Sequence, residues 1–118
     1  MTTAAELRQK RCKPCEGGVT PLAADQIRDM MSAIPQWQLA GTGKSLQREW
    51  RVKDFDAAVR FFNAIGRVAE EQNHHPDLHL TGYRNVRIDL STHAIGGLSE
   101  NDFILAACID QVPVELKK

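Results

Sequence analysis

The sequence lacks long apolar runs, an excess of either charge, and enough cysteines for a disulfide framework. No stretch approaches the roughly 18 apolar residues of a membrane-spanning helix. Lysine plus arginine number 15 and aspartate plus glutamate also number 15, so no basic excess is available to neutralise nucleic-acid phosphates. The polar first residues lack the apolar core of a signal peptide, and only three cysteines are present. These absences predict a cytoplasmic protein that binds neither membranes nor nucleic acid.

The composition is that of one small domain with a core of its own. The chain has 118 residues, and 42% of them are hydrophobic. Residues 1–20 are polar and show no sustained period, which predicts a flexible N-terminal tail before a domain over residues 21–118. Cys12-x-x-Cys15 falls in this tail. Because a zinc site needs four ligands and no second pair follows, we interpret the two cysteines as thiols of the tail.

Two helices are predicted in the first two thirds of the chain. The first covers residues 20–34, since Pro21 is tolerated in a first helical turn and Pro35 ends the helix. The second begins after Asp54, a good N-cap, and ends before Pro76. Apolar residues recur every three or four positions in both. They are Ile27, Met30, Met31 and Ile34 in the first helix, and Phe55, Val59, Phe62, Ile65 and Ala69 in the second.

Four strands are predicted around the second helix, from alternation of apolar and polar residues. They cover residues 37–40, 46–52, 78–81 and 86–92. The residues expected to face the core are Leu46, Trp50 and Val52 in the second strand, and Val86, Ile88 and Leu90 in the fourth. Arg48 interrupts the apolar parity of the second strand. Continuing the parity of the fourth strand places His93 on the same side as Ser91.

A last helix follows the strands and is apolar on every face. Ser99 is its expected N-cap, and Ser99-x-x-Asp102 resembles a capping box with aspartate in place of glutamate. Residues 103–109 are all apolar, so this helix must be buried, either in the core or against another subunit. The element order is α-β-β-α-β-β-α. This order predicts an α+β domain in which a mostly antiparallel sheet carries helices on one face.

The four histidines, His74, His75, His79 and His93, all fall within residues 74–93. One interpretation is that His74 and His75 cap the end of the second helix and meet the negative pole of its dipole. A metal site is a second interpretation, although Pro76 interrupts the spacing and no H-E-x-x-H pattern is present. A third is acid–base catalysis, because histidine exchanges protons near neutral pH. The spacing alone leaves these alternatives open.

A longer pattern includes three of these histidines and resembles a known family. It consists of Glu70-x-x-x-His74-His75-Pro76, followed by Tyr83, His93 and Asp102, together with Ser91-Thr92-His93 and Gly97-Leu98-Ser99. Trp37 and Lys53-Asp54-Phe55 lie upstream. In these residues, over about residues 22–114, the sequence resembles the pterin-4a-carbinolamine dehydratases, known in animals also as a dimerisation cofactor of a homeodomain transcription factor.

The resemblance implies a fold and an activity. The fold is a four-stranded antiparallel sheet with three helices on one face, in homodimers formed through sheet edges or homotetramers formed through helices. The activity is that of a hydro-lyase, which dehydrates 4a-hydroxytetrahydropterin to quinonoid dihydropterin. This reaction recycles the cofactor of aromatic amino acid hydroxylases and implies a functional link to such an enzyme. The alternative is a non-catalytic pterin-binding scaffold or transcriptional cofactor, which loss of a catalytic histidine would indicate.

The resemblance also implies roles for individual residues, with no metal and no organic cofactor. His74, His75 and His93 are the expected catalytic residues; His74 and His93 form the acid–base pair, and His75 mainly holds the pterin. Glu70 and Asp102 are expected to orient histidines, although Asp102 equally suits a helix-capping role and Glu70 a solvated helix position. The expected substrate-binding residues are Asn73, His74, His75, Ser91, Thr92, His93, Ala94 and, as an apolar wall, Trp37.

Overall fold

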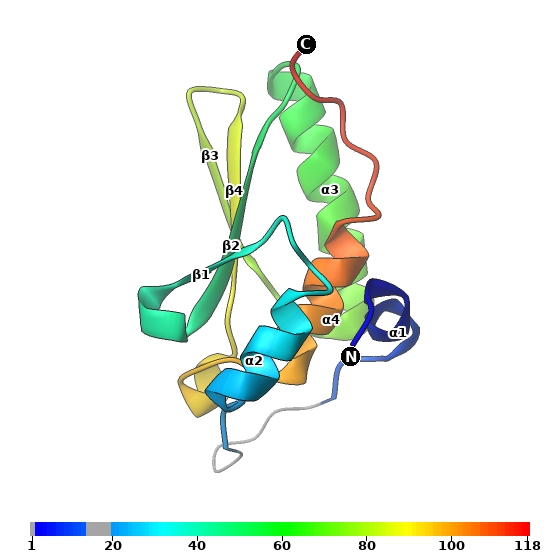
Figure 1. Ribbon diagram of the computed structural model, residues 1–118. Coiled ribbons are helices and arrows are strands. Elements are labelled where there is room, and N and C mark those ends of the chain that lie inside the picture. Colours follow the sequence, from blue (N-terminus) through cyan, green and yellow to red (C-terminus); the bar gives the residue numbers. More distant parts are fainter. Residues whose placement is uncertain (1, 14–19) are drawn as a thin grey trace.

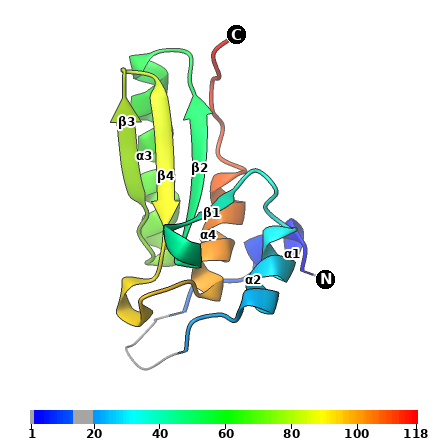
Figure 2. The same cartoon turned by 60° about the vertical axis from the view of Figure 1, so that its left-hand side comes forward.

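The protein is an α+β domain in which helices cover one face of a four-stranded antiparallel sheet (Figures 1 and 2). The computed structural model describes residues 2–13 and 20–118. The strand order is β1-β2-β4-β3. The strands are β1 (Gln38–Ala40), β2 (Ser45–Arg51), β3 (Asp77–Thr81) and β4 (Asn85–Leu90). The fold class and the four strands predicted from the sequence are therefore confirmed.

The helices lie between the strands and at both ends of the chain. They are α1 (Ala4–Gln9), α2 (Ala24–Met31), α3 (Phe55–Gln72) and α4 (Glu100–Ile109), with 3-10 turns η1 (Gly41–Gly43) and η2 (His93–Ile95). The helix α2 begins later than predicted, after Ala23, whose N–H donates to the Gln26 side chain. Among the described residues, none of these helices is long and apolar enough to cross a membrane.

The central strands β2 and β4 supply most of the buried side chains on the helix-covered face of the sheet. They pair antiparallel from Leu46↔Leu90 to Arg51↔Asn85. The six side chains predicted to face the core are all buried: Leu46, Trp50, Val52, Val86, Ile88 and Leu90. The alternation in the sequence therefore predicted the correct inward face of both strands.

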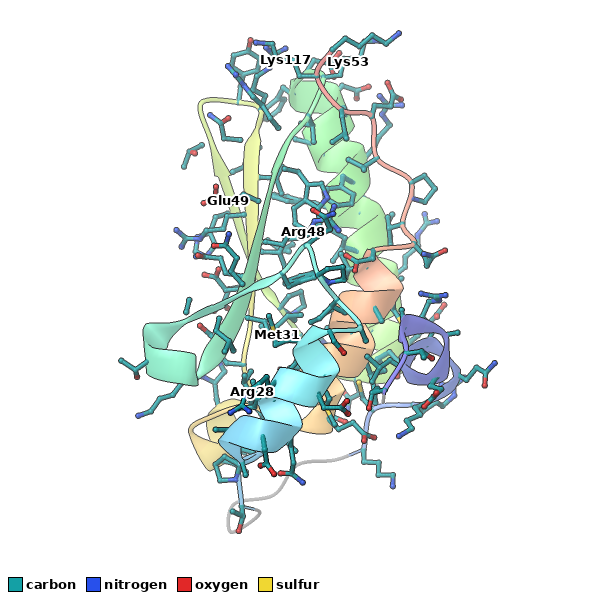
Figure 3. All side chains as sticks on the ribbon, viewed as in Figure 1. Arg28, Met31, Arg48, Glu49, Lys53 and Lys117 are labelled. Atoms are coloured by element: carbon teal, nitrogen blue, oxygen red, sulfur yellow. The ribbon has the colours of Figure 1, made fainter. Side chains whose placement is uncertain are left out.

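Arg48 lies on the helix-covered side of the sheet, although its charge interrupts the apolar parity of β2 (Figure 3). Its Nη1 donates to Asp110 Oδ1 at 2.5 Å, and Trp37 Nε1 donates to the same oxygen at 2.8 Å. The Arg48 guanidinium also lies 4.5 Å from the centre of a Trp50 ring. The charge is tolerated because it is paired and stacked rather than buried alone.

Helix α3 packs with a different face than its sequence predicts. Asp54 is the N-cap, as expected, and its carboxylate accepts a hydrogen bond from Ala57 N. Phe55 and Val59, however, are 56% and 38% exposed. The buried residues are Ala57, Ala58, Phe61, Ile65 and Ala69. The predicted stripe is therefore wrong over the first half of the helix, where alanines and Phe61 face the core and Phe61 packs edge-on against Trp50.

The sequence predicts a flexible tail over residues 1–20, but the structure places the helix α1 within it. Thr3 caps this helix, and the Leu7 side chain is fully buried in the core. Thr2 donates to the Asp29 carboxylate from both its hydroxyl and its N–H, and these hydrogen bonds lower the pKa of Asp29. Cys15 lies outside the described residues. The boundary of the main domain at residue 20 stays a prediction.

Helix α4 is buried within the single chain. All its residues from Asn101 to Ala107, and Ile109, are buried, and α1 and α3 both contact it. Of the two predicted locations for this apolar helix, the core is therefore the correct one. Helix α1 covers the side that would otherwise face water, so α4 by itself gives no argument for a second subunit.

We predict that Leu7→Ala lowers the free energy of unfolding by about 2–5 kcal/mol, because it empties a fully buried site. Leu39→Ala is the matched control, since Leu39 is 46% exposed, and it should cost far less. Urea unfolding of both variants gives the comparison. Equal losses of stability would show that α1 is not part of the core.

Candidate active site

The end of α3 delivers two histidines to one edge of the fold. Asn73 is the C-cap in the left-handed conformation, with φ 51° and ψ 40°, a region that asparagine tolerates better than most residues. Its N–H and that of His74 bond back to carbonyls of the last helical turn. Pro76 cannot continue the helix. The chain therefore leaves α3 at His74 and His75 and enters β3 directly afterwards.

The third histidine, His93, lies in a tight loop after the end of β4 and not in the strand itself. The strand stops at Leu90, and His93 opens η2. Thr92 and Gly97 then pair across the loop. Gly97 lies against Pro21, where an added Cβ would come within 3.1 Å of the proline Cβ. The loop, and not the strand parity predicted from the sequence, thus sets the position of His93.

These two exits meet at a cavity of about 370 Å³. Its lining residues are Lys13, Asn73, His74, His75, Ser91, Thr92, His93, Ala94 and Asn101. The structure therefore brings together every predicted substrate-binding residue except one. The exception is Trp37, for which the predicted role as an apolar wall of the site is wrong. It is 2% exposed in the core, bonded to Asp110 and packed edge-on against Trp50, so it forms no wall of this cavity.

Asp102 lies beneath the cavity with its side chain fully buried. Its Oδ1 is 2.6 Å from His74 Nε2. Its Oδ2 accepts hydrogen bonds from Ser99 N at 3.0 Å and from Thr92 Oγ1 at 2.8 Å. The sequence left a histidine-orienting role and a helix-capping role open for this residue. In the structure, Oδ1 contacts His74 and Oδ2 caps α4.

The contact with Asp102 determines which nitrogen of His74 carries a proton. A carboxylate only accepts hydrogen bonds, so the Nε2 of His74 must be the donor. The neutral ring then keeps Nδ1 unprotonated as a proton acceptor. The His74 side chain is only 12% exposed. Its ring is therefore held in one tautomer and one orientation by a buried anion, the arrangement that carboxylate–histidine pairs provide in catalytic sites.

The other two histidines of the cavity are held more loosely. His93 is exposed. His75 Nε2 lies 3.4 Å from Glu70 Oε1, and these side chains are 56% and 79% exposed. Exposed ion pairs of this kind contribute little to orientation or stability. Glu70 is thus close enough to His75 to act as predicted, but its contact is weaker than that of Asp102 with His74.

His79 is separated from the other three histidines by the alternation of β3. It lies on the open face of the sheet, where its Nε2 is 3.0 Å from Asp89 Oδ2 and Arg87 is close by. The histidine cluster in the sequence therefore divides into three residues at the cavity and one on the sheet. Within residues 2–13 and 20–118, no group of three or more histidine, cysteine or acidic side chains is placed to hold a metal ion.

Two lining residues were missed by the sequence reasoning, Lys13 and Asn101. Asn101 lies next to Asp102 in the first turn of α4. Only this neighbouring residue in the sequence could have pointed to it. Lys13 belongs to the segment that was interpreted as a tail. No local pattern shows that this segment returns to the cavity, because the contact is made over a separation of 88 residues.

The comparisons with known proteins show which family this chain belongs to. The family model described as pterin 4 alpha carbinolamine dehydratase matches residues 20–112. The chain belongs to this family. It is 44% identical over 114 residues to pterin-4-alpha-carbinolamine dehydratase 2, mitochondrial, of Arabidopsis thaliana, covering 94% of this chain and 61% of that protein. It is 42% identical to a putative pterin-4-alpha-carbinolamine dehydratase of Nitrosomonas eutropha, covering 95% and 97%.

Solved structures show the same fold. A transcriptional coactivator/pterin dehydratase from Brucella melitensis superposes with a TM-score of 0.72 at 26% identity, over 79% of this chain and 98% of that one. A pterin dehydratase-like protein described as a RuBisCO assembly factor of the alpha-carboxysome superposes with a TM-score of 0.56 at 23% identity, over 65% and 88%. At that identity the second likeness concerns the fold alone.

Proposed function

We propose that this member of the family dehydrates 4a-hydroxytetrahydropterin to quinonoid dihydropterin and water. The observation that supports the proposal best is the buried Asp102–His74 pair, which shares one cavity with His93. In the reaction the C4a–O bond breaks, the lone pair of N5 forms the C=N bond, and the N5 proton departs. The oxygen leaves as water only when a proton is added to it. One base and one acid in the same cavity meet these needs.

His74 is the better candidate for the base. Asp102 Oδ1 lies 2.6 Å from its Nε2, and an adjacent carboxylate stabilises the positive ring that forms when Nδ1 accepts a proton. The capping and Thr92 hydrogen bonds hold that carboxylate in place. His74 would therefore take the proton from N5 without having to reorient.

His93 is the better candidate for the acid. It is exposed at the cavity rim, so it can regain a proton from water after each turnover. Hydroxide is a poor leaving group near neutral pH, and protonation by an imidazolium ring removes this barrier. The proton that His74 takes up returns to water, so the two histidines end each cycle in their starting states.

The remaining lining residues suit the recognition of a flat, polar ring. Asn73, Ser91 and Thr92 bring amide, hydroxyl and backbone groups to the cavity, which can pair with the donors and acceptors along a pterin edge. Ala94 leaves room beside them, and the exposed His75 would mainly hold the substrate. The dehydration needs no further group, because the pterin lone pair supplies the electrons.

Removing the acid or the base should slow the reaction strongly. His74→Ala and His93→Ala should each reduce the dehydration rate by about two to four orders of magnitude, the usual contribution of such groups. His75→Ala should mainly raise KM. Stopped-flow measurements with synthetic 4a-hydroxytetrahydropterin give kcat and KM separately. A fully active double variant lacking both His74 and His93 would rule out this mechanism.

The two acidic residues beside the histidines should differ sharply in importance. Asp102→Asn presents an amide N–H to His74 and reverses its tautomer, so the rate should fall by about two orders of magnitude or more. Glu70→Gln is the matched control: it also removes one carboxylate charge beside a histidine, but at an exposed pair, and should cost less than about threefold. The same stopped-flow assay measures both. Equal losses would contradict the assigned role of Asp102.

In the cell, the proposed reaction would recycle the cofactor of aromatic amino acid hydroxylases in the cytoplasm, with a functional link to such an enzyme. We also propose a homodimer or homotetramer. This proposal is supported by exposed apolar side chains on α3 and on the edge strands β1 and β3. Phe55, Val59, Leu39 and Leu78 are all more than a third exposed, and exposed apolar surface and strand edges are typical of interfaces.

The mass in solution tests this assembly. Light scattering at micromolar concentration should give two or four times the chain mass of 13.2 kDa. Val59→Glu places a charge on the exposed side of α3 and should lower that mass if the helices associate, without touching the cavity. A wild-type monomer of 13.2 kDa would contradict the proposal.

A further inference from the structure

The N-terminal segment forms one wall of the cavity and is bound there by two side chains. Cys12 N donates to Gln72 Oε1 at 2.8 Å. Lys13 N donates to Asn101 Oδ1 at 2.9 Å, and Asn101 Nδ2 donates back to Lys13 O. The backbone of Lys13 is thus fixed from both sides on the first turn of α4. Lys13 precedes residue 20, where the family match begins, so this wall lies outside the matched residues.

Lys13 has no acidic partner among the residues that the structure describes. Among the described residues that line the cavity, it is the only lysine or arginine, and none is an aspartate or glutamate. Within the described part of the chain, no carboxylate lies within ion-pair distance of its ammonium group, whereas the nearby Lys10 is paired with Glu100 at 3.3 Å. An adjoining hollow of about 280 Å³ shares Ser91, Thr92 and His93 and is lined by Lys44, another cation.

We propose that Lys13 is a specificity-determining residue that binds an anionic group, such as a phosphate, on the substituent of the pterin. This inference rests on the proposed function, because it takes the ring to lie among the histidines. A neutral pterin ring offers no charge to pair with an ammonium group. An anionic substituent does, and the described residues of the cavity lining include no carboxylate that would repel it. The flexible stem and three donors of lysine suit a phosphate at the rim.

The proposal is tested with two stable 7,8-dihydropterins that carry the same three-carbon side chain at C6, one ending in a hydroxyl and one in a phosphate. Fluorescence titration gives a Kd for each, and the measured quantity is the ratio of the two affinities. Wild-type protein should favour the phosphorylated compound. Lys13→Met should reduce this ratio by about threefold to tenfold, as expected for an exposed ion pair with some desolvation, and Lys13→Arg should restore most of it.

Lys10→Met is the matched control, because it removes a neighbouring lysine that does not line the cavity; the ratio should stay at its wild-type value. High salt should reduce the wild-type ratio as well. A ratio of one or less in the wild type, or the same ratio in Lys13→Met, would overturn the proposal. Inorganic phosphate that binds as tightly as the phosphorylated pterin would also overturn it, since the site would then serve a free anion.

The dehydration assay on the same samples tests the proposed function separately. Failure of turnover with an intact, Lys13-dependent affinity ratio would refute the catalytic proposal and support the binding one. Normal turnover with an unchanged ratio would do the reverse. Absence of turnover together with absence of binding by either dihydropterin would refute both.

Discussion

The hydrogen bonds to the buried carboxylate of Asp102 are the interactions on which the site depends. An isolated charge in the core would be strongly unfavourable. Here three donors satisfy it, each from a different part of the chain: His74 after α3, Thr92 after β4, and the Ser99 N–H that begins α4. The same carboxylate therefore binds Thr92 in the loop after β4, caps α4 and orients His74. Loss of any one donor would leave the others facing a less satisfied anion, so the fold and the site are coupled through this residue.

The three histidines of the cavity differ in how firmly their rings are fixed. His74 is fixed by a buried partner, while His75 and His93 remain exposed. A base must meet a defined proton on the substrate, so it benefits from a fixed ring. An acid that is reloaded from water benefits from access to water. The asymmetry of burial thus agrees with the proposed roles of the two histidines, and it arises because the end of α3 places His74 against Asp102 in the first turn of α4.

The sequence was most informative where local chemistry decides the structure. Alternation predicted the inner face of β2 and β4, and Asp54, Ser99 and Pro76 marked helix ends that the structure confirms. The failures involve contacts between distant segments. Nothing local shows that Leu7 covers α4, that Arg48 pairs with the partly buried Asp110, or that Trp37 donates to the same carboxylate. The cluster of histidines pointed to the site, but only the pleat of β3 shows that His79 lies on the opposite face.

The first turn of α4 connects the two walls of the cavity. Two consecutive residues do so: Asn101 binds the backbone of Lys13, and Asp102 binds His74. A displacement of this turn would therefore move the proposed base and the N-terminal wall together. The helix itself is held by packing, since its residues from Asn101 to Ala107 and Ile109 are buried and both α1 and α3 contact it. The N-terminal helix thus stabilises the cavity twice, through Leu7 in the core and through the segment that it leads to the rim. A segment that precedes the matched residues 20–112 therefore forms part of the site.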